Sequence, residues 1–87
     1  MVSIEQKVKS LLTEYFDESE INFENNPNGR VSAIIVSAKF LDVDDPKRQQ
    51  VIWNLLRKKI NKAERLQIIA FLAFTPAEYK WYLEPDF

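Results

Sequence analysis

The sequence predicts a single α/β (α+β) domain: a three-stranded mixed sheet with helices on one face, in the order helix, strand, strand, helix, strand, short helix. Three observations carry this prediction. The N-terminal segment has helical apolar periodicity, two strand-like segments flank a turn at the only glycine, and a third apolar run stops at a helix-start signal. With 87 residues, 46% of them apolar, we expect residues 1–87 to form one domain around one core.

The first predicted element is an amphipathic helix of about four turns that begins after Ser3. Apolar residues recur at helical spacing from Ile4 to Phe16, and Ser3 with Gln6 is typical of a capping box. The acidic run at 17–20 ends the pattern. A half-buried strand over 21–24 follows, because apolar and polar residues alternate there.

The next feature is a predicted hairpin. Residues 25–29 are typical of a tight turn, in which Pro27 presets φ and Gly29 permits a positive φ. The returning strand, Arg30–Ala38, is apolar on both faces, which favours an interior position in the sheet.

A loop and a second helix follow. Asp45 is the expected N-cap and Pro46 lies in the first turn. Asp42, Asp44 and Asp45 also offer oxygen ligands to a hard cation, but the spacing of a calcium-binding EF-hand loop is absent. The alternative interpretation is a solvated loop that caps the helix. The inner face of this helix is predicted to carry Val51, Ile52, Leu55, Leu56 and Ile60, with fraying near Lys59 and a short helical turn at 61–65.

Leu66–Phe74 is predicted to be a buried strand that is apolar on both faces. Its position after a helix implies parallel pairing with the preceding strand. One predicted face carries Leu66, Ile68, Ala70, Leu72 and Phe74, and the other carries Ile69, Phe71 and Ala73. Thr75 and Glu78 then form an expected capping box, with Pro76 at the first helical position.

The run AFTPAEY at 73–79, together with the earlier Phe40, Arg48-Gln49, Val51 and Leu55, resembles the BolA family. The resemblance implies a variant of the class II KH-like fold. It also implies a histidine eight residues before Thr75, which binds a [2Fe–2S] cluster shared with a monothiol glutaredoxin. Gln67 stands at that position here, and residues 25–29, where a second His or Cys ligand would fall, contain neither.

An amide is a poor ligand for iron in a sulfide cluster, which favours thiolate or imidazole. We therefore expect no cofactor and no shared cluster. Binding of a monothiol glutaredoxin without the cluster is the partner interaction that the resemblance still allows.

The chain has no histidine and no cysteine, which excludes disulfides and thiolate or imidazole metal sites. No nucleophile elbow, phosphate-binding loop or paired-carboxylate motif is present, so we predict that the protein is not an enzyme. The first ten residues lack a signal-peptide core, and no apolar run approaches the ~20 residues of a membrane span. The expected location is cytoplasmic, without membrane association.

The net charge of −1 conceals a basic segment. Residues 1–45 carry −5, residues 46–65 carry +6 and residues 66–87 carry −2. Such a segment can neutralise phosphates, and KH-like folds are known to bind nucleic acid, although the GxxG clamp is absent. The candidate nucleic-acid-binding residues are Lys47, Arg48, Arg57, Lys58, Lys59, Lys62 and Arg65. The alternative interpretation is a solvated helix face.

The main functional prediction is a small non-enzymatic adaptor or regulator that acts through a protein partner, with nucleic-acid binding as the alternative. Several large aromatics compete for a small core, among them Trp53 and Phe87, so some are expected at an interaction surface. The candidate partner-binding residues are Gln67, Tyr79, Trp81 and Tyr82. Tyr79 and Tyr82 alternatively dock the last helix on the sheet.

Overall fold

The structure is a computed structural model that describes residues 3–24 and 26–84. The helices are α1 (Ile4–Leu12), α2 (Asp45–Leu56), α3 (Lys62–Arg65) and α4 (Pro76–Leu83), with 3₁₀ turns at Glu18–Glu20 and Ala38–Phe40. The strands are β1 (Ile21–Phe23), β2 (Val31–Val36) and β3 (Ile68–Phe74). The predicted order of the main elements is therefore confirmed, including the short turn that became α3.

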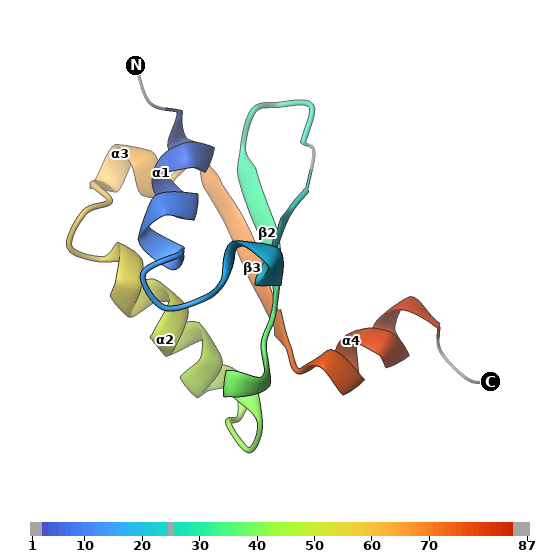
Figure 1. Ribbon diagram of the computed structural model, residues 1–87. Coiled ribbons are helices and arrows are strands. Elements are labelled where there is room, and N and C mark those ends of the chain that lie inside the picture. Colours follow the sequence, from blue (N-terminus) through green and yellow to red (C-terminus); the bar gives the residue numbers. More distant parts are fainter. Residues whose placement is uncertain (1–2, 25, 85–87) are drawn as a thin grey trace.

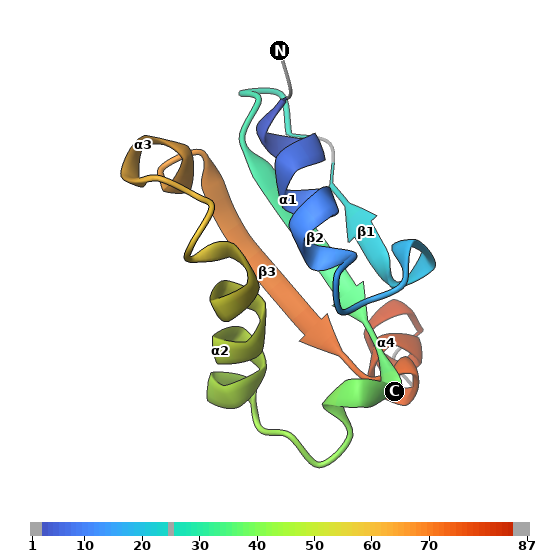
Figure 2. The same ribbon diagram turned by 60° about the vertical axis from the view of Figure 1, so that its left-hand side comes forward.

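The sheet has the order β1-β2-β3, with β1 and β2 antiparallel and β2 and β3 parallel. The interior position predicted for the second strand is confirmed. Helices α1 and α2 lie over one face of the sheet, α3 lies at the start of β3, and α4 extends beyond its end (Figure 1; Figure 2). One core joins these layers, and its fully buried members include Val8, Leu12, Ala33, Ile35, Ile52 and Leu56.

The first helix is shorter than predicted. Hydrogen bonds continue after its end at Leu12 only as a turn, in which the Phe16 N–H donates to the Leu12 carbonyl oxygen over 2.9 Å. The turn still buries Phe16 but leaves Tyr15 exposed. The apolar spacing therefore predicts the burial of Phe16 correctly, although α1 ends at Leu12 and only a turn carries the chain on to Phe16.

The predicted faces of the third strand are wrong in part, because β3 contains a β-bulge. Val31 pairs with Ile68 and Ser32 pairs with Ala70, so Ile69 has no partner in the register. An extra residue reverses the alternation beyond it. Ile68, Phe71 and Ala73 consequently face the core, while Ile69, Ala70 and Leu72 are exposed.

Two loop positions require a positive φ. Gly29 has φ 76° in the hairpin, as predicted, and Asp42 has φ 62° before α2. The expected N-cap was one residue late: Asp44 is the N-cap and Asp45 is the first helical residue. Within the described residues, Asp42, Asp44 and Asp45 form no cluster able to hold a metal ion.

Candidate functional site

The basic segment folds around two adjoining hollows beside α2, which share Trp53, Arg57 and Arg65. We call the two together the basic groove, and the hollow between α2 and α3, of about 340 Å³, the inner pocket. The inner pocket is lined by Trp53, Leu56, Arg57, Ile60, Asn61, Lys62 and Arg65. The second hollow, of about 370 Å³, adds Pro46, Lys47, Gln49 and Gln50.

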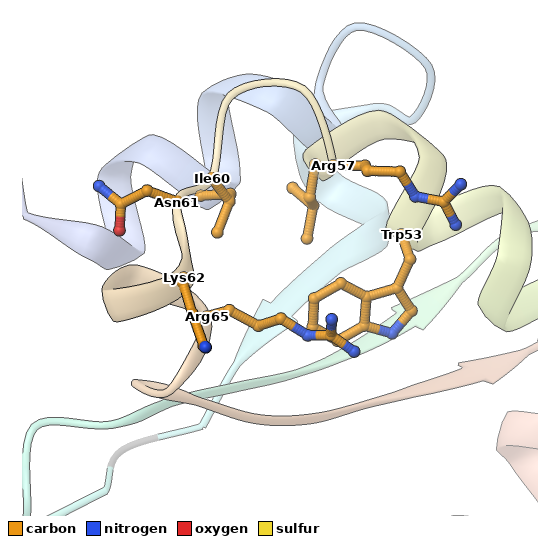
Figure 3. Close-up of a pocket in the computed structure, with 7 residues that line it drawn as sticks. Trp53, Arg57, Ile60, Asn61, Lys62 and Arg65 are labelled. Atoms are coloured by element: carbon orange, nitrogen blue, oxygen red, sulfur yellow. The ribbon is translucent and has the colours of Figure 1, made fainter.

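Side chains in the inner pocket combine positive charge with an apolar wall (Figure 3). The Arg65 side chain extends across the indole of Trp53, and its guanidinium carbon lies 5.2 Å from the ring centroid. Trp53 also makes an edge contact with Phe71, at a centroid distance of 5.3 Å. Trp53 is thus held between the core and Arg65.

Four of the seven predicted nucleic-acid-binding residues line the groove: Lys47, Arg57, Lys62 and Arg65. Lys58 and Lys59 are exposed but line neither hollow. The groove also includes apolar residues that a search for charge alone does not find. Trp53, Leu56, Arg57 and Ile60 recur at i, i+3, i+4 and i+7, and this spacing is the signal that groups them on one face.

The prediction that Arg48 is one of the exposed basic residues is wrong. Its side chain is buried and connects three segments of the fold by hydrogen bonds. Arg48 is only 8% exposed. Its guanidinium donates to the carbonyl oxygens of Val43 (2.6 Å), Ala73 (3.1 Å) and Phe40 (3.1 Å), and to both carboxylate oxygens of Glu78 (2.6 and 3.3 Å). All five N–H donors of an arginine are thereby used. Arg48 joins the loop before α2, the end of β3 and the start of α4.

The carboxylate of Glu78 accepts hydrogen bonds both from Arg48 and from the backbone in the capping box of α4. Its Oε1 accepts from the Thr75 N–H over 2.8 Å, and the Thr75 hydroxyl accepts from the Glu78 N–H over 3.3 Å. The predicted capping box is confirmed. The hydrogen bond from Arg48, followed by that from the Thr75 backbone, lowers the pKa of Glu78 from 4.5 to about 2. The same hydrogen bond raises the pKa of Arg48.

An aromatic surface lies at the same end of β3, around Phe74 and α4. The ring of Phe74 contacts those of Tyr79 and Tyr82 in tilted arrangements, at centroid distances of 5.9 and 5.1 Å, so the tyrosines do dock α4 on the sheet. Further exposed apolar side chains belong to β3 and α4, and Trp81 is 62% exposed. We define the aromatic surface as Leu72, Phe74, Tyr79, Trp81, Tyr82 and Leu83. The exposed Leu72 and Leu83 were not predicted, because the bulge and the helix end decide their exposure.

Gln67 lies at the opposite end of β3 from this aromatic surface, so the structure separates the predicted partner-binding residues into two places. The Gln67 carbonyl oxygen accepts from the Val31 N–H over 2.8 Å, which puts it beside the end of the hairpin. Asn26, in the described part of that hairpin, donates its amide to Arg30 and Ser32 (3.1 and 3.0 Å). These amide groups do not fit an iron–sulfur cluster, since neither supplies imidazole or thiolate.

The remaining predicted properties concern metals, membranes and residue 87. No group of three or more Asp or Glu side chains within residues 3–24 and 26–84 is arranged to hold a metal ion. None of the described helices is long and apolar enough to cross a membrane. Phe87 lies outside the described residues.

Comparison with known proteins shows the fold. No protein-family model and no curated protein matches the chain. Among solved structures, BolA1 from Arabidopsis thaliana is similar, with a TM-score of 0.69 and 19% sequence identity. The alignment covers 90% of this chain and 98% of the BolA1 chain. The fold is therefore BolA-like, as the AFTPAEY motif predicted.

Proposed function

We propose that this chain, whose fold is BolA-like, is a small non-enzymatic adaptor or regulator that acts by binding a protein partner. The observation that carries the proposal is the aromatic surface, where Trp81, Tyr82 and Leu83 are all more than half exposed on a helix that extends beyond the sheet. Exposed aromatic side chains of this kind are enriched at protein interfaces, where they bury large areas at low entropic cost.

The way α4 is held also supports this role. The two-pronged Arg48–Glu78 contact and the contacts of Tyr79 and Tyr82 with Phe74 fix the helix to the rest of the fold. Trp81 is therefore presented on a rigid support without contributing to the buried core. A preorganised surface lowers the entropic cost of association.

The test is affinity capture from cells of the source organism, with wild type, Trp81→Ala and the exposed-aromatic control Tyr15→Ala. We expect a specific protein that is enriched by wild type and Tyr15→Ala and lost with Trp81→Ala. The purified partner should then bind the wild type in a calorimeter at least tenfold more tightly than Trp81→Ala. Equal capture by all three forms, or no enrichment over a control resin, contradicts the proposal.

A monothiol glutaredoxin is the partner that a BolA-like fold suggests first. Because Gln67 and Asn26 do not fit a cluster, such a complex would form without one. Co-expression followed by copurification tests the partner, and the visible absorption of the complex tests the cluster. Copurification without iron–sulfur absorption is the expected result if glutaredoxin is the partner.

Nucleic acid is the second candidate ligand, favoured by one observation: the basic groove gathers Lys47, Arg57, Lys62 and Arg65, and no described residue that lines it is acidic. Phosphate binding by these cations would weaken steeply with salt. Titration of labelled DNA and RNA at low and moderate salt, with Arg57→Ala as the variant, tests it. Absence of binding at low salt removes this candidate.

A further inference from the structure

Within the described residues, no cation of the basic groove forms an ion pair. The ion pairs among residues 3–24 and 26–84 are Lys7–Glu64, Lys9–Glu18 and Arg48–Glu78, and none involves a groove residue. Glu64, the acidic residue of the basic segment, points its carboxylate to Lys7 of α1 at 2.9 Å instead. The groove therefore presents an uncompensated positive field to a ligand.

The inner pocket also has an apolar wall, which a ligand must match in addition to the positive charge. Its wall includes Trp53, Leu56 and Ile60, and Ile60 points into the space between α2 and α3 (Figure 3). The volume of about 340 Å³ is at the lower end of the ~300–1,000 Å³ typical of ligand pockets. A ligand that fills the groove thus needs negative charge along its length and one apolar group at the pocket.

Details of the groove disfavour a nucleic acid strand. Proteins that bind single strands offer aromatic faces on which bases stack. Trp53 is instead engaged by Arg65 across the ring and by Phe71 at 5.3 Å. No glycine occurs in residues 46–65 to allow close approach of a sugar-phosphate backbone.

We propose that the basic groove binds an acidic segment of the protein partner, with one aliphatic side chain of that segment seated in the inner pocket. Carboxylates of the segment pair with Lys47, Arg57, Lys62 and Arg65, and the aliphatic group contacts Trp53 and Ile60. The groove reaches Lys47, which is adjacent to the Arg48 that holds α4. This inference rests on the proposed adaptor function and defines the chemistry of the partner.

The test uses a fluorescein-labelled peptide of eight glutamates with a central leucine, and the full-length chain. The control probes are the same peptide with serine in place of leucine, and a nine-nucleotide thymidine strand of similar charge. We expect the leucine peptide to bind, the serine peptide to bind at least fivefold more weakly, and the oligonucleotide to bind more weakly than the leucine peptide.

Matched charge reversals locate the site. Arg65→Glu and Lys62→Glu should each weaken binding of the leucine peptide at least tenfold. Lys58→Glu and Lys59→Glu make the same change in net charge outside the hollows, and should weaken it less than threefold. Circular dichroism of each variant confirms that it is folded.

Three results would overturn the inference: equal binding of leucine and serine peptides, tighter binding of the oligonucleotide, or equal effects of Lys58→Glu and Arg65→Glu. The first shows that the pocket is unused, the second assigns the groove to nucleic acid, and the third shows diffuse electrostatic attraction. None of them affects the Trp81-dependent capture that tests the adaptor function itself.

Discussion

Arg48→Ala is expected to be the most destabilising single truncation outside the apolar core, because Arg48 donates to the buried Ala73 carbonyl oxygen over 3.1 Å and pairs with Glu78. The Phe40 carbonyl oxygen, also 3.1 Å from the guanidinium, keeps a second hydrogen bond, from the Val43 N–H over 3.0 Å. An unpartnered Ala73 carbonyl costs about 1–3 kcal/mol and the lost Glu78 pair about 1–2 kcal/mol, so we predict a loss of about 2–5 kcal/mol in the free energy of unfolding. That is a large fraction of the ~5–15 kcal/mol that stabilises a typical domain.

The Glu78 side of the same contact predicts a dependence on pH. At ~1.4 kcal/mol per pKa unit, lowering the pKa of Glu78 from 4.5 to about 2 corresponds to about 3 kcal/mol. The Glu78 side chain is 47% exposed, and solvent screening reduces the expected contribution to about 1–2 kcal/mol. Because the folded pKa is the lower one, this contribution is present above pH 4.5 and is lost as the pH falls from 4.5 to about 2.

Urea denaturation followed by circular dichroism measures both effects. Glu78→Gln should be about 1–2 kcal/mol less stable than wild type at pH 7 and equal to it near pH 2. Lys47→Ala, an exposed neighbour of Arg48, should change stability by less than about 0.5 kcal/mol. A loss below about 1 kcal/mol for Arg48→Ala, or a Glu78→Gln deficit that is the same at pH 7 and pH 2.5, would refute the reasoning.

Three further predictions concern other parts of the fold. Gly29→Ala should lower the free energy of unfolding by about 1–2 kcal/mol in urea denaturation, because the φ of 76° strains an alanine although the space around it is open; an unchanged value would contradict the strain argument. Gln49→Ala removes the 2.8 Å hydrogen bond from Nε2 to the Phe71 carbonyl oxygen at the free edge of β3, and an unprotected sheet edge can pair with another chain. Light scattering should therefore show more self-association of the variant than of the wild type. A strictly monomeric variant would count against protection of the edge by Gln49. Gln67→His combined with Asn26→His, co-expressed with a monothiol glutaredoxin, should produce iron–sulfur absorption that wild type lacks. A colourless variant complex would argue that these two positions do not correspond to the ligand sites.

The fold was largely predictable because its signals are local. The capping box at Thr75–Glu78, the positive φ of Gly29 and the alternation of the strands each depend on a few neighbouring residues. The faces of β3 were not predictable beyond Ile68, since a single unpaired Ile69 reverses them. The end of α1 at Leu12 was missed for a related reason: Phe16 is buried by a turn whose spacing imitates a helix.

The sequence indicated which residue types form the candidate site, but only partly where their side chains lie. The basic segment was found by its charge, and the structure places its members Arg57, Lys62 and Arg65 in one hollow; their binding role stays a prediction. Arg48 was misassigned, because its contacts with Phe40 and Ala73 join residues up to 25 positions apart. No local pattern separates an arginine that satisfies distant carbonyl groups from one that faces solvent.

Site-specific photocrosslinking in cells of the source organism examines whether the protein acts through a partner bound at the aromatic surface. A benzophenone amino acid replaces Trp81 in one form and the exposed Glu5 of α1 in the other. We expect one dominant crosslinked protein at position 81 that is absent at position 5, and that binds the purified wild-type chain directly. Identical crosslinks at both positions, or none at position 81, would contradict it.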